Sequence, residues 1–124
     1  MTSEQARAFA DDWAAAWNEL ALERVLSHFD ENVTFTSPTA LLVVGVATVV
    51  GKHALREYWN TAVARVGSLH FAVDRVLWDA GTRELAIIYD SETGGRRKRV
   101  SENLTFDADG LVVRAEVFHG VDER

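Results

Sequence analysis

The spacing of apolar residues changes at Gly67, and this change limits the folds that the chain can adopt. Before Gly67, apolar residues recur every three or four positions, as they do along one face of a helix. After Gly67 they alternate with polar residues, which is typical of strands with one buried face. Helices that are separated along the chain from strands joined by short turns predict an α+β fold.

Three apolar stripes predict three helices in the N-terminal half. Thr2 and Gln5 form a capping-box pair at the start of the first helix, because each side chain can bond the other's free backbone amide. Gly67 follows the third helix, where a left-handed cap favours glycine. The expected helices cover residues 2–20, 22–29 and 51–66, and a short strand is expected at 33–36.

Four strands are expected after Gly67, and short turns connect the last three. Gly94-Gly95 fits a two-residue hairpin turn, and residues 107–110 fit a longer one. The expected strands cover residues 69–78, 84–91, 96–106 and 111–119.

The turn at Gly94-Gly95 assigns each side chain of its hairpin to one face of the sheet. It pairs Tyr89 with Val100 and Ile87 with Glu102, and paired residues share a face. The face that we expect to be buried consists of Leu85, Ile87, Tyr89, Val100, Glu102, Leu104 and Phe106. On the last strand, the more apolar face consists of Leu111, Val113, Ala115, Val117 and His119, which leaves Val112 and Phe118 outside.

Glu102 is the carboxylate on this expected inner face. A carboxylate among apolar side chains loses hydration, which raises its pKa toward the range useful for general acid or base catalysis. One interpretation makes Glu102 the acid/base group, with Tyr89 and His119 as its hydrogen-bonding partners. The other makes Glu102 a structural residue that bonds Tyr89 or a helix tryptophan and organises the core.

Several apolar side chains are candidates for lining a pocket that holds a hydrophobic ring system. They are Trp13, Trp17, Trp59, Phe35, Val100, Leu104 and Val117. Packing within the core is the alternative for the tryptophans, because aromatic stripes on helices are usually buried.

Composition excludes several classes of function. Lys and Arg number 13 against 19 Asp and Glu, so the formal net charge is −6, which disfavours nucleic-acid binding. Without cysteine, the chain forms no disulfide and no thiolate metal site. We assign no carboxylate or histidine partner at metal-ligand spacing to His28, His53 or His70, and we expect neither a metal nor a cofactor. No apolar run is long enough to span a membrane and no signal peptide is visible, so we expect a cytoplasmic protein.

Two further segments stand out by composition. The apolar segment from Leu41 to Val50 is expected to be a loop that either covers the mouth of the pocket as a lid or contacts a second subunit. Together with Val112 and Phe118 on the outer sheet face, it predicts a homodimer. The basic run from Arg96 to Arg99 is expected to be a solvated hairpin tip, with the rim of a site for an anionic ligand as the alternative.

The order of elements and four motifs resemble the nuclear transport factor 2-like superfamily and, within it, the SnoaL-like proteins. The motifs are Phe29–Val33, Ser37-Pro38, Gly51–Trp59 and Phe106–Leu111. The resemblance runs from about Glu4 to His119, so residues 1–124 are expected to form a single domain. It implies a cone-shaped, curved antiparallel sheet packed on three N-terminal helices, with a pocket inside the cone.

The resemblance also narrows the function. It implies an isomerase, cyclase or hydrolase that acts without a cofactor on a small apolar, cyclic ligand; a non-catalytic ligand-binding or protein-interaction domain is the alternative. In ketosteroid isomerases, the position of Glu102 carries an acidic oxyanion-hole residue. However, Ser37 replaces the aspartate that shuttles the proton in those enzymes, and Trp13 replaces a tyrosine. The steroid isomerase route is therefore disfavoured.

Overall fold

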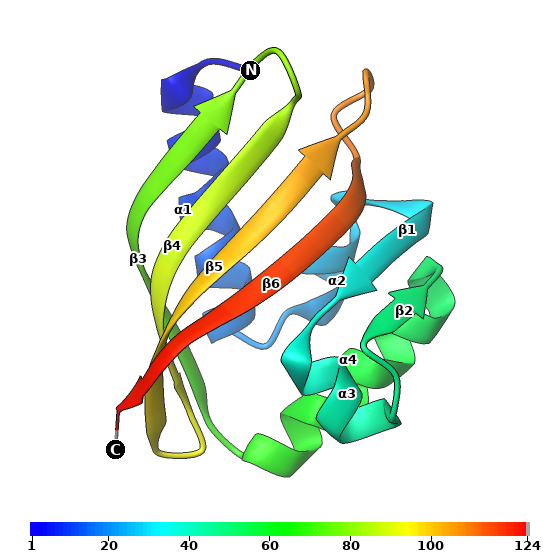
Figure 1. Cartoon of the computed structure of the whole chain (residues 1–124), viewed down its shortest axis with the longest axis vertical. Coiled ribbons are helices and arrows are strands. Elements are labelled where there is room, and N and C mark those ends of the chain that lie inside the picture. The colour runs from blue at the N-terminus through cyan, green and yellow to red at the C-terminus, as the bar shows by residue number, and fades with distance from the viewer. Residues whose placement is uncertain (124) are drawn as a thin grey trace.

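The helices and strands follow the change of period at Gly67, because the helices lie before it and the longest strands lie after it (Figure 1). The computed structural model describes residues 1–123, and for Glu123 it describes the backbone only. The helices are α1 (Ser3–Asn18), α2 (Leu22–Leu26), α3 (Pro38–Val44) and α4 (Lys52–Val66). The strands are β1 (Phe29–Thr36), β2 (Thr48–Val50), β3 (Leu69–Asp79), β4 (Glu84–Thr93), β5 (Arg96–Phe106) and β6 (Val112–Glu123).

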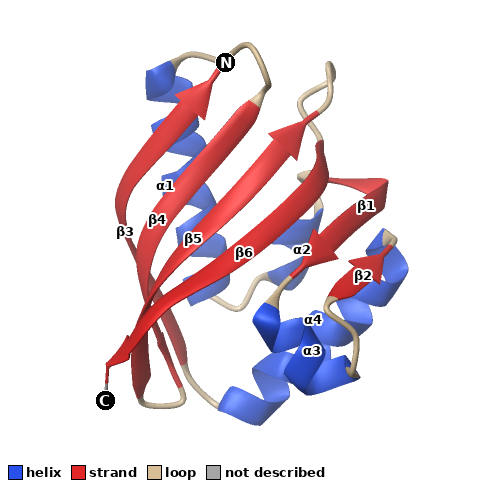
Figure 2. Ribbon diagram, viewed as in Figure 1, coloured by secondary structure: helices blue, strands red, loops and turns tan. Residues whose placement is uncertain are grey.

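The six strands form one open, curved sheet in the order β2-β1-β6-β5-β4-β3, which confirms the α+β class (Figure 2). Helix α1 packs against β3, and α4 packs against β1. The sheet departs from the expected antiparallel arrangement at one place, because β1 and β6 are parallel. Parallel neighbours need a long connection, and here the chain between them includes α4 and the three strands β3, β4 and β5.

The segment around Leu41–Val50 is not a loop, and the molecule has a fourth helix. Ser37 caps α3 by accepting a hydrogen bond from the Thr39 backbone amide, and Pro38 occupies the first turn. Gly45 ends α3 with a φ of +82°, which glycine adopts without strain. Strand β2 follows and pairs with β1. The second helix is also shorter than expected, because Phe29 pairs with β6 and begins β1.

The register of the hairpin between β4 and β5 is as the two-residue turn predicts. Tyr89 pairs with Val100, and Ile87 pairs with Glu102. Gly94 and Gly95 have φ values of +57° and +80°, the combination that a type I′ turn requires. Glu102 therefore points to the helix side of the sheet.

The expected orientation of Val112 is wrong. The pairing of β5 with β6 shifts between Thr105 and Phe106, so that Phe106 lies opposite Val112 while Thr105 lies opposite Arg114. This irregularity reverses the alternation at the start of β6, and Val112 is fully buried in the core. Beyond it the alternation is as expected, and Phe118 is exposed on the outer face.

Among residues 1–123, no helix combines the length and the apolar character needed to cross a lipid bilayer.

The side chain of Asn18 ties the end of α1 to the first residues of β3. Its Nδ2 donates to the Phe71 carbonyl at 3.0 Å, and its Oδ1 accepts from the Phe71 amide at 2.7 Å. Strand β3 is an edge strand, so this side-chain amide replaces the pairing that a further strand would provide.

We expect Asn18→Ala to lower the free energy of unfolding by about 1–3 kcal/mol, because it leaves the two backbone groups of Phe71 without these partners. Urea unfolding followed by circular dichroism measures this loss. Asn60→Ala, at an exposed position of α4, is the matched control and should change stability by less than about 0.5 kcal/mol. Equal effects of the two substitutions would contradict a role for the Asn18 contact.

Candidate functional site

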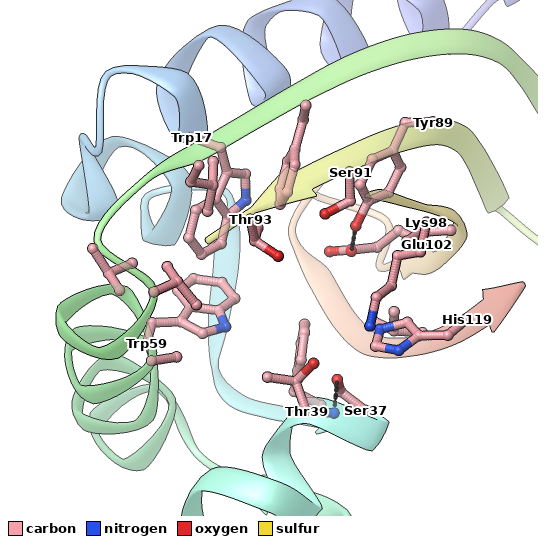
Figure 3. A pocket seen from close by; sticks show the side chains of 18 of the residues that line it. Trp17, Ser37, Thr39, Trp59, Tyr89, Ser91, Thr93, Lys98, Glu102 and His119 are labelled. Carbon is pink, nitrogen blue, oxygen red and sulfur yellow. Dashed lines mark hydrogen bonds between the residues drawn. The ribbon is translucent and has the colours of Figure 1, made fainter. Parts of the chain in front are cut away.

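A cavity of about 130 Å³ lies between the inner face of the sheet and helices α1 and α4 (Figure 3). Its wall is mostly aromatic and aliphatic, with polar groups from Ser37, Thr39, Tyr58, Tyr89, Ser91, Thr93, Lys98, Glu102 and His119. An apolar cavity of roughly 150 Å³ holds one benzene molecule. The enclosed space therefore accommodates about one six-membered ring.

The exposure of the lining residues distinguishes a closed end from an open end. Trp17, Trp59, Tyr89 and Glu102 are all buried, and they line the closed part. Lys98 and several other lining residues are partly exposed, and they mark the side open to solvent: Ala62, Val63, Val66, Leu69, Thr93 and His119. The side open to solvent is therefore bordered by the C-terminal half of α4 and by residues of β3, β4, β5 and β6.

Glu102 lies in the buried wall and is paired with Tyr89. The Tyr89 hydroxyl donates to Glu102 Oε1 at 3.1 Å, and the other carboxyl oxygen faces the cavity (Figure 3). Burial raises the pKa of Glu102 to about 7, and the hydrogen bond from Tyr89 opposes this rise only in part. Burial and the nearby carboxylate raise the pKa of Tyr89 well above its usual range, so Tyr89 remains a hydrogen-bond donor.

Tyr58, Ser37 and Thr39 bring a second group of hydroxyls to the cavity wall. Ser37 comes from the end of β1, Thr39 from the start of α3 and Tyr58 from α4. Burial raises the pKa of Tyr58 to about 12, although the neighbouring hydroxyls of Ser37 and Thr39 oppose the rise. At neutral pH the Tyr58 phenol is therefore protonated and able to donate a hydrogen bond.

His119 lies at the open side, where β6 pairs it with Val100. Partial burial and the positive charge of Lys98 lower the pKa of His119, while Asp122 opposes the change. The imidazole is therefore mainly neutral at pH 7. Among residues 1–123, no group of three His, Asp or Glu side chains is arranged to hold a metal ion.

The structure brings most of the predicted site residues to one cavity. Those that line it are Glu102, Tyr89, His119, Trp17, Trp59, Phe35, Val100 and Val117. Trp13 and Leu104 are fully buried and are not among the lining residues. Trp13 stacks on Phe71 and meets the Tyr89 ring edge-on, so it supports the wall from behind.

Sequence reasoning missed several lining residues, although a signal existed for most of them. The alternation that places Tyr89 and Val100 inside also places Ser91 and Lys98 inside, since each lies two positions away on the same strand. Tyr58 lies beside Trp59 on the apolar stripe of α4. None of the residues 41–50 lines the cavity, which leaves a lid formed by this segment without support.

Solved structures with the same fold cover nearly the whole chain. A SnoaL-like protein of unknown function from Burkholderia thailandensis is 28% identical, with a TM-score of 0.84, and the match covers 97% of this chain and 98% of that one. The epoxide hydrolase/cyclase-like enzyme SalBIII, described with a role in pyran ring formation in the polyether salinomycin, is 18% identical, with a TM-score of 0.78 and coverage of 95% and 92%. TerC, co-crystallised with polyporic acid, is 16% identical, with a TM-score of 0.75 and coverage of 93% and 92%.

No curated protein matches the sequence. The SnoaL-like domain family, by contrast, matches residues 10–115, which include α4, β3, β4 and β5 in full. Most of the residues that line the cavity lie within this range. The protein therefore belongs to the SnoaL-like domain family.

Proposed function

We propose that the protein is a cofactor-independent enzyme that moves a proton on a small, apolar, cyclic substrate, as an isomerase or cyclase does. Glu102 is the proton-transfer group. The observation that carries the proposal is the Glu102 carboxyl itself, which is buried, bonded to Tyr89 and open to an otherwise largely apolar cavity.

The energetic cost of burying the Glu102 carboxylate favours a chemical role for this residue over a structural one. Burying a carboxylate without a cation is unfavourable, and no positive charge contributes to its pKa. A neutral amide would accept the same hydrogen bond from Tyr89 at lower cost. A pKa near 7 is, in contrast, what a general acid or base needs in order to accept and release a proton at neutral pH.

The hydroxyls of the cavity suggest how the proton transfer is assisted. In the proposed reaction, the Glu102 carboxylate takes a proton from a carbon next to a carbonyl group. The Tyr58 phenol donates a hydrogen bond to the carbonyl oxygen, on which negative charge develops. When a carbon–carbon double bond adjoins this carbon, the negative charge extends over it, and Glu102 returns the proton to the far carbon of that double bond. The double bond thereby moves into conjugation with the carbonyl group, so that charge and atoms balance. Tyr89 orients the carboxyl, and His119 supplies a neutral hydrogen-bonding group at the entrance.

Two similar structures support a small-molecule reaction in this fold. SalBIII is described with ring formation, and TerC was crystallised with polyporic acid. The size of the cavity here adds a limit of about one six-membered ring for the enclosed part of the ligand. A non-catalytic ligand-binding domain would use the same cavity but would need no proton transfer.

Hydrogen–deuterium exchange tests the proposal without knowledge of the natural substrate. One-ring ketones, cyclohexanone and cyclohexenone among them, are incubated with the protein in D₂O, and proton NMR follows the loss of the signals next to the carbonyl. We expect the wild type to accelerate this exchange for at least one ketone. Glu102→Gln should slow it by about 10²–10⁴-fold, because the amide cannot accept the proton.

Glu116→Gln is the matched control, since Glu116 is an exposed carboxylate on the outer face of β6. It should exchange at the rate of the wild type. Ketones that bind without exchanging, or exchange that is equally fast with Glu102→Gln, would contradict the proposed proton transfer; the former result would favour the non-catalytic alternative.

The dependence of stability on pH provides a second prediction. The folded-state pKa of Glu102 is about 7 and its ordinary value is 4.5, so the folded state holds the proton more tightly. The stability that Glu102 contributes is complete below pH 4.5 and is lost as the pH rises to about 7. We expect the free energy of unfolding of the wild type, relative to that of Glu102→Gln, to fall by on the order of 3 kcal/mol over this interval. Urea unfolding at a series of pH values measures it, and parallel curves for the two proteins would refute the shift.

We also propose that the chain forms a homodimer. Phe118 on the outer sheet face is exposed, and so are Leu42 on α3 and Val50 on β2, the last two by 82% and 67%. Exposed apolar side chains on these three elements favour burial against a second copy. Sedimentation equilibrium at micromolar concentration should give twice the mass of one chain, and Phe118→Ser or Leu42→Ser should shift the equilibrium toward the monomer. A single-chain mass for the wild type would overturn this proposal.

A further inference from the structure

Lys98 brings a positive charge to the wall of the cavity. It lies on β5 two positions before Val100, and the alternation of the strand turns it to the inner side. Its neighbour Arg97 is on the outer side and is exposed. Figure 3 shows the Lys98 side chain on the same side of the cavity as His119, whose pKa is lowered in part by the charge of Lys98.

The acidic residues near Lys98 are paired with arginines. Asp122 lies opposite Lys98 in the register of β5 and β6, but its carboxylate pairs with Arg96. Asp90 pairs with Arg99. Among the side chains that the structure describes, Lys98 thus has no carboxylate within ion-pair distance, although the side chain is half-buried.

The groups around Lys98 are suited to an anion. Ser91 pairs with Lys98 across β4 and β5, and its hydroxyl lines the cavity together with that of Thr93. His119 is mainly neutral, partly because of the charge of Lys98, and a neutral imidazole can donate one hydrogen bond. The open side of the cavity therefore combines one full positive charge with several neutral hydrogen-bond donors.

We propose that Lys98 binds a carboxylate of the substrate, so that the ligand is an apolar ring carrying one negative charge. The ring then extends from Lys98 into the buried part of the cavity, whose wall includes Trp59 and Glu102. A single ammonium with neutral donors matches a monoanion, and the small cavity leaves room for a carboxylate and about one ring. This inference rests on the proposed function, because it assigns a class of substrate to the same cavity.

Benzoate and benzamide form a matched pair of probes, because they have nearly the same shape and differ in charge. Binding is followed by the fluorescence of the cavity tryptophans below the pKa of Glu102, where that carboxyl is protonated and benzoate is still ionised. We expect the wild type to bind benzoate about tenfold more tightly than benzamide, as a charge-assisted hydrogen bond in a half-buried site provides. Lys98→Gln should abolish this preference.

Arg97→Gln is the control, since it removes the same charge from the adjacent position but on the outer face. It should retain the preference for benzoate. The proposal is overturned if Lys98→Gln retains the preference for benzoate, or if Arg97→Gln loses as much of this preference as Lys98→Gln does. It is also overturned if the wild type binds benzamide as tightly as benzoate, or if it binds neither compound at millimolar concentration.

The same titration separates this inference from the proposed reaction. Binding of benzoate needs no proton transfer, so Glu102→Gln should keep the preference for benzoate while losing deuterium exchange. A preference that depends on Lys98, in a protein that exchanges no ketone, would support the anion site and contradict the enzyme. Deuterium exchange that depends on Glu102, without a preference for benzoate, would support the enzyme and contradict the anion site.

Discussion

The turn at Gly94-Gly95 is the constraint on which the site depends. Both glycines have positive φ, which most other residues adopt only with strain, and the resulting type I′ turn fixes the pairing of β4 with β5. A shift of one residue would turn Ser101 and Asn103 toward the helices and place Glu102 in solvent. The position of one carboxyl group therefore follows from the geometry of a two-residue turn that ends seven positions before it, at Gly95.

The cavity formed by this register has a mostly apolar wall with polar groups in both its buried part and its open side. Glu102 and Tyr89 lie in the closed part, and Lys98 and His119 lie at the opening. Because the pKa of Glu102 is about 7, its carboxyl is partly protonated at neutral pH, whereas Lys98 carries a positive charge. A bound carboxylate would therefore meet a cation at the entrance and a partly protonated acid at the reacting end. In the proposed complex, these two groups would orient a ring-shaped ligand in one direction along the cavity.

The sequence predicted the fold class, the hairpin register and the burial of Glu102, because each follows from local periodicity or from one turn. It did not predict that Val112 is buried, since an irregularity between strands depends on tertiary pairing and leaves no mark on the alternation of apolar residues. Helix α3 was missed because Ser37-Pro38 can end a strand or begin a helix, and here it does both. For the site, the alternation of apolar and polar residues predicted that Glu102 points inward, and it also implied the same orientation for Lys98. By contrast, the exclusion of Trp13 and Leu104 from the cavity depends on how the helix packs on the sheet.

The central claim is that Glu102 holds its proton up to neutral pH because it is buried in the cavity wall. Carbon-13 NMR of protein labelled at the glutamate side-chain carboxyls measures this directly, with the Glu102 signal assigned by its absence from Glu102→Gln. The account predicts a titration midpoint for this signal of about 7. A midpoint at the ordinary value of 4.5 would mean that the carboxyl is hydrated and charged at neutral pH, which would contradict the account.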